Sequence, residues 1–451
     1  MAVLSLLVLF FSNLCFPVLN VATASNIEFQ GRALLQWKMA LKTQELLDTW
    51  TSKTSPCNWT GITCRYNGHR MPTITRVQLG QLGLEGELET LNFSALPSLR
   101  VLNLSNNHVH GSIPTCISAL SKLTILDLSA NNLTGIIPSE LGNLTRLKTL
   151  WLFENQISGS IPLSFGKLKN LNSLDISAIS LVGSIPLVFG NLTKLNVLYL
   201  WGNDLDGSIP CDIGNLVNLR DFEISDNQIT GHIPHSIRNL TKLETFYLSG
   251  NNIKGSIPGE VGNLMNLRDF NIYDNQMTCP IPDCIRNLTK LESLHLGKNN
   301  INGSIPSEIG NLLNLRDFGL YENQITSSIP PRIGNLTKLE SFYLGNNNIN
   351  GFIPSEIGNL VNLKYFGLYK NQITGSIPPS LGSLKCLIYL NLDNNHLSGI
   401  LPIEISNLTN LMYLQLSYNN LSDNLPPDLA KGGLLQYLGL SYNNFQGPIP
   451  L

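Results

Sequence analysis

A 24-residue spacing of apolar residues runs from Leu96 to the last residue, Leu451, without insertion or deletion. In the unit that opens at Leu240, apolar residues stand three, six, eight, thirteen and seventeen positions further on, with polar residues between them. A degenerate unit with Val77 and Leu84 precedes this array, and a partial unit that begins near Leu435 follows it. No single unit can bury its own apolar residues, so we expect successive coils to stack on one another.

The stretch Phe246–Leu248 alternates between inward and outward positions, which predicts a short strand. Stacked strands of this kind would form one long parallel sheet on the concave side. A period in this range with an LxxLxxLxLxxN core is the signature of leucine-rich repeats. The predicted fold is therefore an α/β solenoid: a right-handed leucine-rich-repeat superhelix with a parallel concave sheet.

An asparagine recurs at the point of the unit where the chain turns inward. A buried turn leaves backbone N–H and C=O groups without partners, and an amide side chain can satisfy both kinds. The fourth unit has Ile179 at this position, and we expect a local irregularity there. The asparagines with this predicted structural role are Asn107, Asn131, Asn155, Asn203, Asn227, Asn251, Asn275, Asn299, Asn323, Asn347, Asn371, Asn395, Asn419 and Asn443.

Most units also contain a GxIP motif, such as Gly255-Ser-Ile-Pro258, in which glycine allows a tight bend and proline fixes φ. This 24-residue GxIP unit resembles the ectodomains of plant leucine-rich-repeat receptor kinases and receptor-like proteins. The resemblance covers essentially the whole chain after its first segment. In full-length receptor kinases, a cysteine cap, a membrane helix and a Ser/Thr kinase domain follow the repeats. The sequence ends at Leu451 without these, so we expect a truncated ectodomain and no enzyme activity.

Three regions are predicted. Residues 1–24 form a signal peptide, because Ala2 to Leu19 is mostly apolar and Ala22-Thr23-Ala24 matches a cleavage site. Residues 25–70 form a helical N-terminal cap, in which Leu34, Trp37 and Leu41 have helical spacing. Residues 71–451 form the solenoid, with about 15 repeats, a degenerate first unit and no C-terminal cap, so the apolar edge of the last coil would be uncovered.

The Cys57-x-Trp59-x-Gly61-x-x-Cys64 motif is similar to the N-terminal cap of the same plant family, which implies a Cys57–Cys64 disulfide. Closing this short loop would contribute about 2.5 kcal/mol in the chain-entropy description. Cys279 and Cys284 lie in one unit, and a local bridge between them is left open. Cys116, Cys211 and Cys386 are expected to be unpaired thiols. A metal site would need a second Cys/His pair at ligand spacing, and we predict none.

Composition favours a secreted binding scaffold. Charged residues make up 13% of the chain and the formal net charge is -2, so neither nucleic acid nor an anionic membrane is an expected partner. Five Asn-Leu-Thr sequons recur every 48 residues at the end of alternate units, and a sixth shares their column. We expect a glycan-coated flank; the alternative is that the motif only serves turn chemistry. The candidate glycosylation sites are Asn58, Asn92, Asn143, Asn191, Asn239, Asn287, Asn335 and Asn407.

The outward strand positions are the candidate binding surface. Aromatic rings bury a large area at low entropy cost, which favours a role in an interface. The aromatic residues at these outward positions are Trp151, Phe153, Tyr199, Trp201, Tyr247, Tyr273, Tyr321, Tyr343, Tyr365, Tyr369, Tyr389, Tyr413 and Tyr437. Acids lie among them: Asp221, Glu223, Asp226, Asp269, Asp274, Asp317 and Glu322. The alternative is that tyrosine merely suits a strand surface and that Asp221, Asp269 and Asp317 pair with the arginines preceding them.

The resembled receptors bind secreted peptides, or occasionally steroids, along the concave surface and recruit a shorter leucine-rich-repeat co-receptor. Steroid-type members have an island domain within the repeats; no insertion occurs here, so a peptide is favoured. We expect an extracellular module that acts in signalling for defence or development, either apoplastic or at the plasma membrane. The alternative function is a secreted inhibitor of microbial cell-wall-degrading enzymes, similar to polygalacturonase inhibitors. An extended peptide would contact Tyr199, Trp201, Asp221, Glu223, Tyr247, Asp269, Asn271, Tyr273, His295, Asp317 and Tyr321.

Overall fold

The computed structural model describes residues 26–66, 72–429 and 431–449. The chain forms two compact units, Met1–Leu195 and Asn196–Leu451. The predicted signal peptide lies outside the described residues, as does the predicted boundary between cap and solenoid near residue 70. No helix within the described ranges is long and apolar enough to cross a membrane.

The first unit begins with the predicted helical cap. Helix α2 (Ile27–Ala40) starts at Asn26, whose side chain accepts a hydrogen bond from the Glu28 N–H and so satisfies a free helix-end donor. The rings of three tryptophans, Trp37, Trp50 and Trp59, pack in sequence with centroid distances of 6.4 and 5.3 Å. The Cys57–Cys64 disulfide is present, with an S–S distance of 2.00 Å. These contacts confirm the helical, disulfide-containing cap.

Strand pairing joins the cap to the repeats of the first unit. Strand β1 (Ile62–Arg65) pairs antiparallel with β2 (Thr73–Gln78), and β2 opens a parallel sheet. The parallel sheet continues through β4 (Val101–Asn103), β6 (Ile125–Asp127), β8 (Thr149–Trp151) and β10 (Ser173–Asp175). Short strands follow in each coil: β3 (Glu85–Glu87), β5 (His108–Ser112), β7 (Asn132–Thr134), β9 (Ser158–Gly159) and β11 (Ser180–Ser184).

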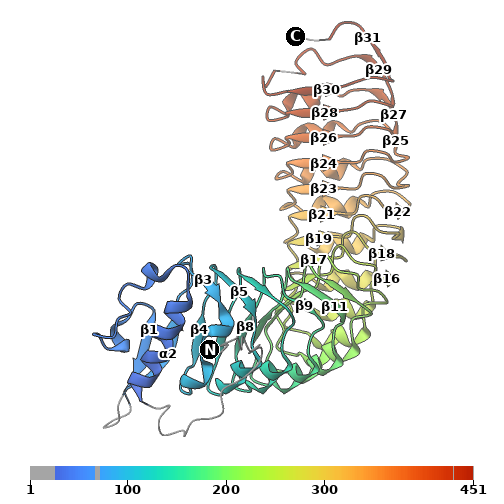
Figure 1. Ribbon diagram of the computed structural model, residues 1–451. Helices are drawn as coiled ribbons and strands as arrows, with labels where there is room; N and C mark the ends of the chain where they lie inside the picture. Colours follow the sequence, from blue (N-terminus) through green and yellow to red (C-terminus); the bar gives the residue numbers. More distant parts are fainter. Residues whose placement is uncertain (1–25, 67–71, 430, 450–451) are drawn as a thin grey trace, which may run out of the picture. The chain divides into compact units, whose positions relative to one another are not determined.

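The second unit repeats one coil throughout. Its long parallel sheet pairs every residue i with residue i+24 (Figure 1). The long-sheet strands are β12 (Val197–Tyr199), β14 (Asp221–Glu223), β15 (Thr245–Tyr247), β17 (Asp269–Asn271), β19 (Ser293–His295), β21 (Asp317–Gly319), β23 (Ser341–Tyr343), β24 (Tyr365–Gly367), β26 (Tyr389–Asn391), β28 (Tyr413–Gln415) and β30 (Tyr437–Gly439). This in-register stacking places equal positions of successive coils in columns.

Two further layers complete each coil of the second unit. Five-residue 3-10 helices follow the GxIP proline, which is the residue before each helix, as at Pro258 before Gly259–Asn263. Short strands line a third side: β13 (Asp204–Asp206), β16 (Lys254–Gly255), β18 (Gln276–Met277), β20 (Asn302–Gly303), β22 (Gln324–Ile325), β25 (Thr374–Gly375), β27 (His396–Ile400), β29 (Asn420–Asn424) and β31 (Asn444–Gln446). The prediction of a leucine-rich-repeat solenoid is confirmed.

The core between these layers is apolar, and equivalent side chains of successive coils stack in columns. Phe222, Phe246 and Phe270 are fully buried and stack with ring centroids 5.6 Å apart. Phe318, Phe342 and Phe366 continue the column at 5.5 and 5.7 Å. Offset-parallel rings of this kind add attraction beyond their buried area. These phenylalanines all occupy the inward strand position that the alternation at Phe246–Leu248 predicts.

The asparagine column performs the predicted backbone function. The Asn299 side chain donates to the carbonyl oxygens of Ile272, Leu296 and Gly297 at 2.9 to 3.2 Å, and it accepts from the Met277 N–H at 2.9 Å. The same pattern recurs at Asn251 and Asn347. One amide thus links two adjacent coils through groups that would otherwise be buried without partners.

The predicted irregularity at Ile179 is limited to hydrogen bonding. Ala178, just before it, has φ +48°, the same left-handed turn seen at Ala130 and Asp226. Ile179 is buried, but its side chain has no acceptor for the Ile157 N–H, whereas the equivalent Leu133 N–H is bound by Asn155. The backbone therefore keeps its path while the column loses one amide.

The last coil is less covered than the others. Leu435, Leu438, Leu440 and Phe445 are half-buried and Ile449 is exposed, although equivalent residues in inner coils are fully buried. The expected uncovered apolar edge is therefore present among the residues described near the end of the sequence.

Candidate ligand-binding face

Three columns of side chains project from the open face of the long sheet in the second unit. Each strand contributes its first residue, its third residue and the residue two positions further on, because successive residues point to opposite faces. The first column contains Asp221, Asp269 and Asp317. The second contains Tyr199, Glu223, Tyr247, Asn271 and His295, and the third contains Trp201, Tyr273 and Tyr321. All eleven predicted contact residues thus lie on one face of this unit.

Four polar groups of this face have no side-chain hydrogen bond or ion pair among the described residues. They are the carboxylates of Asp269 and Asp317, the Ser293 hydroxyl and the His295 imidazole, and all four side chains are half-buried. Asp269, Ser293 and Asp317 are neighbours in one column, and His295 stands two residues after Ser293. Half-buried polar groups without partners favour a ligand that supplies hydrogen bonds. We call these four residues the polar cluster.

Burial sets the electrostatics of the cluster. It raises the pKa of Asp269, and the nearby Glu292 carboxylate adds to this effect. Burial lowers the pKa of His295, while Asp317 and Asp269 partly oppose that shift. Burial, with Asp269 and Glu223 close by, raises the pKa of Tyr247 to about 12, so this phenol remains a hydrogen-bond donor at neutral pH.

Other predicted contact residues are partly satisfied within the protein. Asp221 accepts a hydrogen bond from the Thr245 hydroxyl at 2.8 Å. The Asn271 side-chain oxygen accepts from the Tyr273 N–H at 2.9 Å, so it supports the backbone of its own coil. The structure therefore separates the predicted residues into an unsatisfied group around His295 and a more self-contained group at Asp221 and Asn271.

The alternative in which the acids of the first column pair with their preceding arginines is wrong. Arg220 forms an ion pair with Glu244, Arg268 with Glu292 at 2.6 Å, and Arg316 with Glu340 at 2.8 Å. Lys364 also contacts Glu340, at 2.6 Å. The two residues of each arginine–glutamate pair are 24 residues apart, and the pairs repeat every 48 residues. The charged residues therefore form a separate column beside the strands. Its basic residues are engaged there, which leaves the carboxylates of Asp269 and Asp317 uncompensated.

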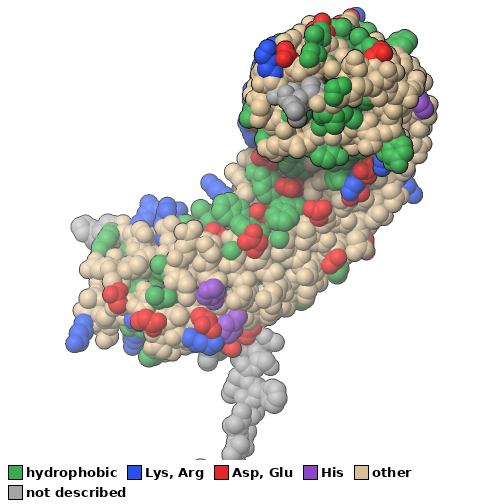
Figure 2. Space-filling view, turned by 90° about the horizontal axis from the view of Figure 1, so that it is seen from above, with side chains coloured by type: hydrophobic (Ala, Val, Ile, Leu, Met, Phe, Trp, Pro, Cys, Tyr) green, Lys and Arg blue, Asp and Glu red, His purple; other side chains and the backbone are tan. Residues whose placement is uncertain are grey.

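The tyrosines form two kinds of arrangement. Tyr273 and Tyr321 lie with ring centroids 5.8 Å apart and tilted by 43°, and Tyr321 meets Tyr343 edge-on at 6.5 Å. Nearer the end of the sequence, Tyr389, Tyr413 and Tyr437 stack at 4.6 and 4.4 Å. Figure 2 shows hydrophobic side chains and carboxylates lying among one another across the middle of the visible face.

Four glycines on the same face were missed by the sequence reasoning. Gly297, Gly319, Gly345 and Gly367 are buried in outward columns where other coils carry large side chains. The available signal was the alternation of glycine with tyrosine along a column, as in Tyr321, Gly345 and Tyr369.

Comparisons with known proteins agree with this architecture. A family model described as "Leucine-rich repeat region" matches residues 84–225, one for the leucine-rich-repeat N-terminal domain matches 27–65, and a leucine-rich-repeat model matches 337–397. Among curated proteins, the chain is 35% identical over 108 residues to the Arabidopsis thaliana leucine-rich repeat receptor-like serine/threonine-protein kinase RGI4, a stretch covering 24% of this chain and 9% of that kinase.

Solved structures match over much more of the chain. A TDR receptor has a TM-score of 0.74 and 32% identity, covering 83% of this chain and 69% of the receptor. The plant peptide hormone receptor RGFR1, in complex with RGF2, has a TM-score of 0.64 and 32% identity, with 86% and 72% coverage. The Arabidopsis receptor kinase HAESA, in complex with the peptide hormone IDA and the co-receptor SERK1, has a TM-score of 0.58 and 28% identity, with 93% and 87% coverage.

The chain belongs to the plant leucine-rich-repeat receptor kinase family. It corresponds to the ectodomain of these receptors, and within the described residues this ectodomain consists of the cap and the repeats. The stretches that match this chain are a small part of the length of the curated kinases.

The other cysteines within the described ranges form no disulfide. Cys279 and Cys284, for which a bridge was left open, do not form one, and Cys116, Cys211 and Cys386 are also unpaired with other cysteines. Cys279 occupies the usual glycine position of its coil with φ +66°, so its backbone follows the repeat and not the geometry of a local bridge.

The predicted glycosylation column lies on the 3-10 helix side of the ectodomain, away from the open face. Its members are the last residues of their helices and are exposed: Asn143, Asn191, Asn239, Asn287, Asn335 and Asn407. Asn58, at the end of a cap helix, is exposed and Asn92 is half-buried. Their modification stays a prediction.

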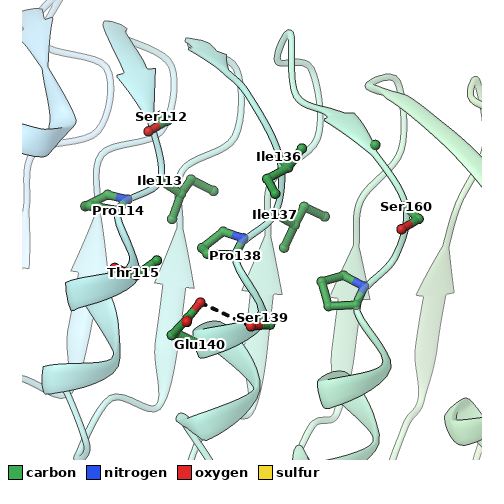
Figure 3. Close-up of a pocket in the computed structure, with 12 residues that line it drawn as sticks. Ser112, Ile113, Pro114, Thr115, Ile136, Ile137, Pro138, Ser139, Glu140 and Ser160 are labelled. Atoms are coloured by element: carbon green, nitrogen blue, oxygen red, sulfur yellow. Dashed lines mark hydrogen bonds between the residues drawn. The ribbon is translucent and has the colours of Figure 1, made fainter. Parts of the chain in front are cut away.

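A hollow of about 550 Å³ lies outside the predicted binding face (Figure 3). It is lined by GxIP segments of the first unit, including Pro114, Ile136 and Pro138, and a hydrogen bond joins Ser139 to Glu140 at 3.2 Å. A similar hollow lies near Ile400 in the second unit, and in both places an isoleucine stands where most GxIP segments have serine.

Proposed function

We propose that this ectodomain recognises a secreted peptide on the open face of the long sheet in its second unit. The observation that carries the proposal is the polar cluster: Asp269, Ser293, His295 and Asp317 are half-buried, lie in adjacent strands, and form no side-chain hydrogen bond or ion pair with any residue that the structure describes. An extended peptide carries N–H donors and side chains at regular intervals, which suits a row of acceptors repeated from strand to strand.

The proposed footprint extends from this cluster across neighbouring coils. Tyr247, Tyr273 and Tyr321 would supply ring surface on either side, with Tyr199, Trp201, Asp221, Glu223 and Asn271 completing the surface expected from the sequence. Aromatic anchors of this kind are enriched at recognition surfaces, where they carry much of the binding energy. The RGFR1 and HAESA complexes support a peptide as the class of ligand, since both contain a peptide hormone.

We further propose a shorter leucine-rich-repeat co-receptor as the second partner, supported by SERK1 in the HAESA complex. The site of action would be the apoplastic side of the plasma membrane, in signalling for defence or development. The role proposed for this chain is binding and not catalysis.

The test is selection of peptides from a random phage-displayed library on the purified chain, followed by affinity measurement with the selected synthetic peptides. Replacing both Asp269 and Asp317 by asparagine should weaken binding roughly tenfold or more, because paired carboxylates lose their charge-assisted hydrogen bonds. Glu356→Gln is the matched control, since Glu356 lies on a 3-10 helix outside the face.

Unchanged affinity in the double variant would contradict this placement of the ligand. If no peptide is selected and the chain instead binds a fungal polygalacturonase, the inhibitor function is correct and the peptide-receptor proposal is wrong.

A further inference from the structure

Next to the polar cluster, three tyrosine rings lie against a floor of glycines. A Cβ atom placed on Gly345 would clash with the Tyr369 ring, whose Cδ1 would be only 2.6 Å away. A Cβ on Gly367 would lie 3.0 Å from Cδ1 of Tyr343, and one on Gly297 would lie 3.1 Å from Cε1 of Tyr321. We call Tyr321, Tyr343 and Tyr369 with this glycine floor the tyrosine basin.

The glycines determine how the basin is built. All are buried, whereas the three tyrosines above them are half-buried and keep part of their surface open. Because glycine has no side chain, each ring can lie down on the backbone of a neighbouring coil and need not stand upright. The upright alternative is seen at Tyr389, Tyr413 and Tyr437, which stack on one another and so cover each other's faces. The basin therefore lies in the second and third columns, beside the first column in which those tyrosines stack.

Charged residues of both signs flank the basin: Glu322 follows Tyr321 directly and Lys370 follows Tyr369. Burial is the main cause that raises the pKa values of Tyr343 and Tyr321; Asp317 adds to the shift of Tyr343, and Glu322 adds to that of Tyr321. Within the described part of the chain neither carboxylate forms an ion pair, and the nearby arginine, Arg316, is engaged by Glu340. Uncompensated carboxylates beside aromatic faces attract a cation and not a neutral ring or sugar.

The protein already seats one cation in this way at the edge of the basin. The Lys298 ammonium lies 5.1 Å from the centroid of the Tyr273 ring and 3.8 Å from the Asp274 carboxylate. Tyr273 is in turn adjacent to Tyr321, with centroids 5.8 Å apart. The pairing of a ring with a carboxylate around a positive charge is thus available here. Tyr321 with Glu322 repeats it two coils further on, where Lys298 is close enough to interact with Glu322 but, among the described residues, forms neither an ion pair with Glu322 nor a ring contact with Tyr321.

We propose that the tyrosine basin is a subsite for an arginine side chain of the ligand. A guanidinium group fits better than an ammonium group because its flat surface can stack on a ring while its edge donates to a carboxylate. Tyr321, Tyr343 and Tyr369 would hold the guanidinium, and Glu322, which lies beside Tyr321 and Tyr369, would accept its hydrogen bonds. The inference rests on the proposed function, since it specifies one residue type within the bound peptide.

The subsite can be tested without knowing the ligand. N-acetyl-arginine methylamide is titrated into the full chain with 13C-labelled tyrosine rings, and its neutral isostere N-acetyl-citrulline methylamide is titrated in parallel. The arginine probe should shift the resonances of Tyr321, Tyr343 and Tyr369, assigned with single Tyr→Phe variants, and should bind at least fivefold more tightly than the citrulline probe. Equal affinity of the two probes would overturn the subsite.

Two variants test the two halves of the basin separately. Gly345→Ala should displace the Tyr369 ring and weaken the arginine probe several-fold, whereas Gly259→Ala, where a Cβ meets nothing within 4 Å, should leave it unchanged. Glu322→Gln removes charge without moving a ring and should also weaken the arginine probe while leaving citrulline unaffected. Arginine binding that both variants leave intact would contradict the proposal.

The two proposals fail in distinguishable ways. If selected peptides depend on Asp269 and Asp317 but tolerate citrulline in place of every arginine, only the subsite is wrong. If the arginine probe moves the three tyrosines but no peptide is selected, the subsite is supported and the peptide-receptor function is wrong.

Discussion

At the scale of single residues, chemically similar side chains have different roles because the fold gives them different surroundings. Asn299 is buried and its side chain binds four backbone groups, whereas the side chain of the next residue, Asn300, is exposed and accepts a hydrogen bond from the Gln324 side chain at 3.5 Å. Asp269 and Asp221 occupy the same column, but among the described residues a side-chain donor binds Asp221 and none binds Asp269. The role of a residue type here therefore depends on its burial and on the hydrogen-bond partners around it.

Asn299→Ala should destabilise the second unit by about 1–3 kcal/mol, because the Met277 N–H and the Ile272 carbonyl remain buried without their partner. Hydrogen exchange at the Met277 amide should accelerate most. Asn300→Ala is the adjacent control and should change neither the urea midpoint nor this amide. Equal protection of the Met277 amide in both variants would show that the asparagine column is not needed there.

Asp269→Asn should stabilise the ligand-free protein at neutral pH. The folded-state pKa of Asp269 is raised from its ordinary value of 3.8, chiefly by burial. A raised folded pKa means that this group favours folding when protonated, below pH 3.8, and that the benefit is lost as pH rises through the folded pKa. The variant should therefore match the wild type below pH 3.8 and exceed it near pH 7.

Urea midpoints at the two pH values test this expectation, with the exposed Asp212→Asn as control. A constant difference between Asp269→Asn and wild type at both pH values would contradict it. A residue retained at a cost to stability is consistent with a role in recognition.

At the scale of elements, the 48-residue alternation of coil types produces a column of opposite charges beside the strands. Arg268 and Glu292 belong to adjacent coils and form an ion pair that is about half exposed. Exposed pairs of this kind contribute little individually, at most about 1 kcal/mol. Their larger effect is to neutralise this border, so that the uncompensated negative charge remains on the open face.

Arg268→Glu should lower stability by no more than about 1 kcal/mol and more strongly at low salt, because it places like charges in adjacent coils. Adding Glu292→Arg should restore part of the stability, because it recreates this pair in reverse but leaves position 268 matched in charge with Glu244 and position 292 with Arg316. A double-mutant cycle from urea denaturation at low and high salt measures the coupling. Purely additive losses would show that the two side chains do not interact.

At the scale of the whole molecule, the layers assign different surfaces to different tasks. The Asn-Leu-Thr sequons lie at the ends of 3-10 helices, and the predicted ligand residues lie on the open face of the long sheet. Glycans on the helix side would therefore leave that face accessible.

Glycopeptide mapping of the chain expressed in plant cells should find Asn143, Asn191, Asn239, Asn287 and Asn335 occupied, because each is exposed at a helix end. Removing these five sequons by Asn→Gln substitution should lower solubility but leave peptide affinity unchanged. A large loss of peptide affinity would indicate that this flank, and not the open face alone, contacts the ligand.

The period of leucines and the asparagine column were sufficient to predict the repeat fold, the phenylalanine core and the outward columns. They suffice because each coil repeats the same local pattern, so burial of one residue implies burial of its equivalents. The resemblance to plant receptors was needed for the Cys57–Cys64 bridge, which the structure contains.

Only the tertiary structure decided which outward side chains lack partners. The arginines preceding Asp269 and Asp317 pair with Glu292 and Glu340 of the next coil, and the tyrosine rings settle onto Gly345 and Gly367. These contacts join residues 24 or more positions apart and depend on side-chain direction, which periodicity does not specify. The sequence by itself thus determined the columns, while packing between coils determined which of their charges and rings remain available to a ligand.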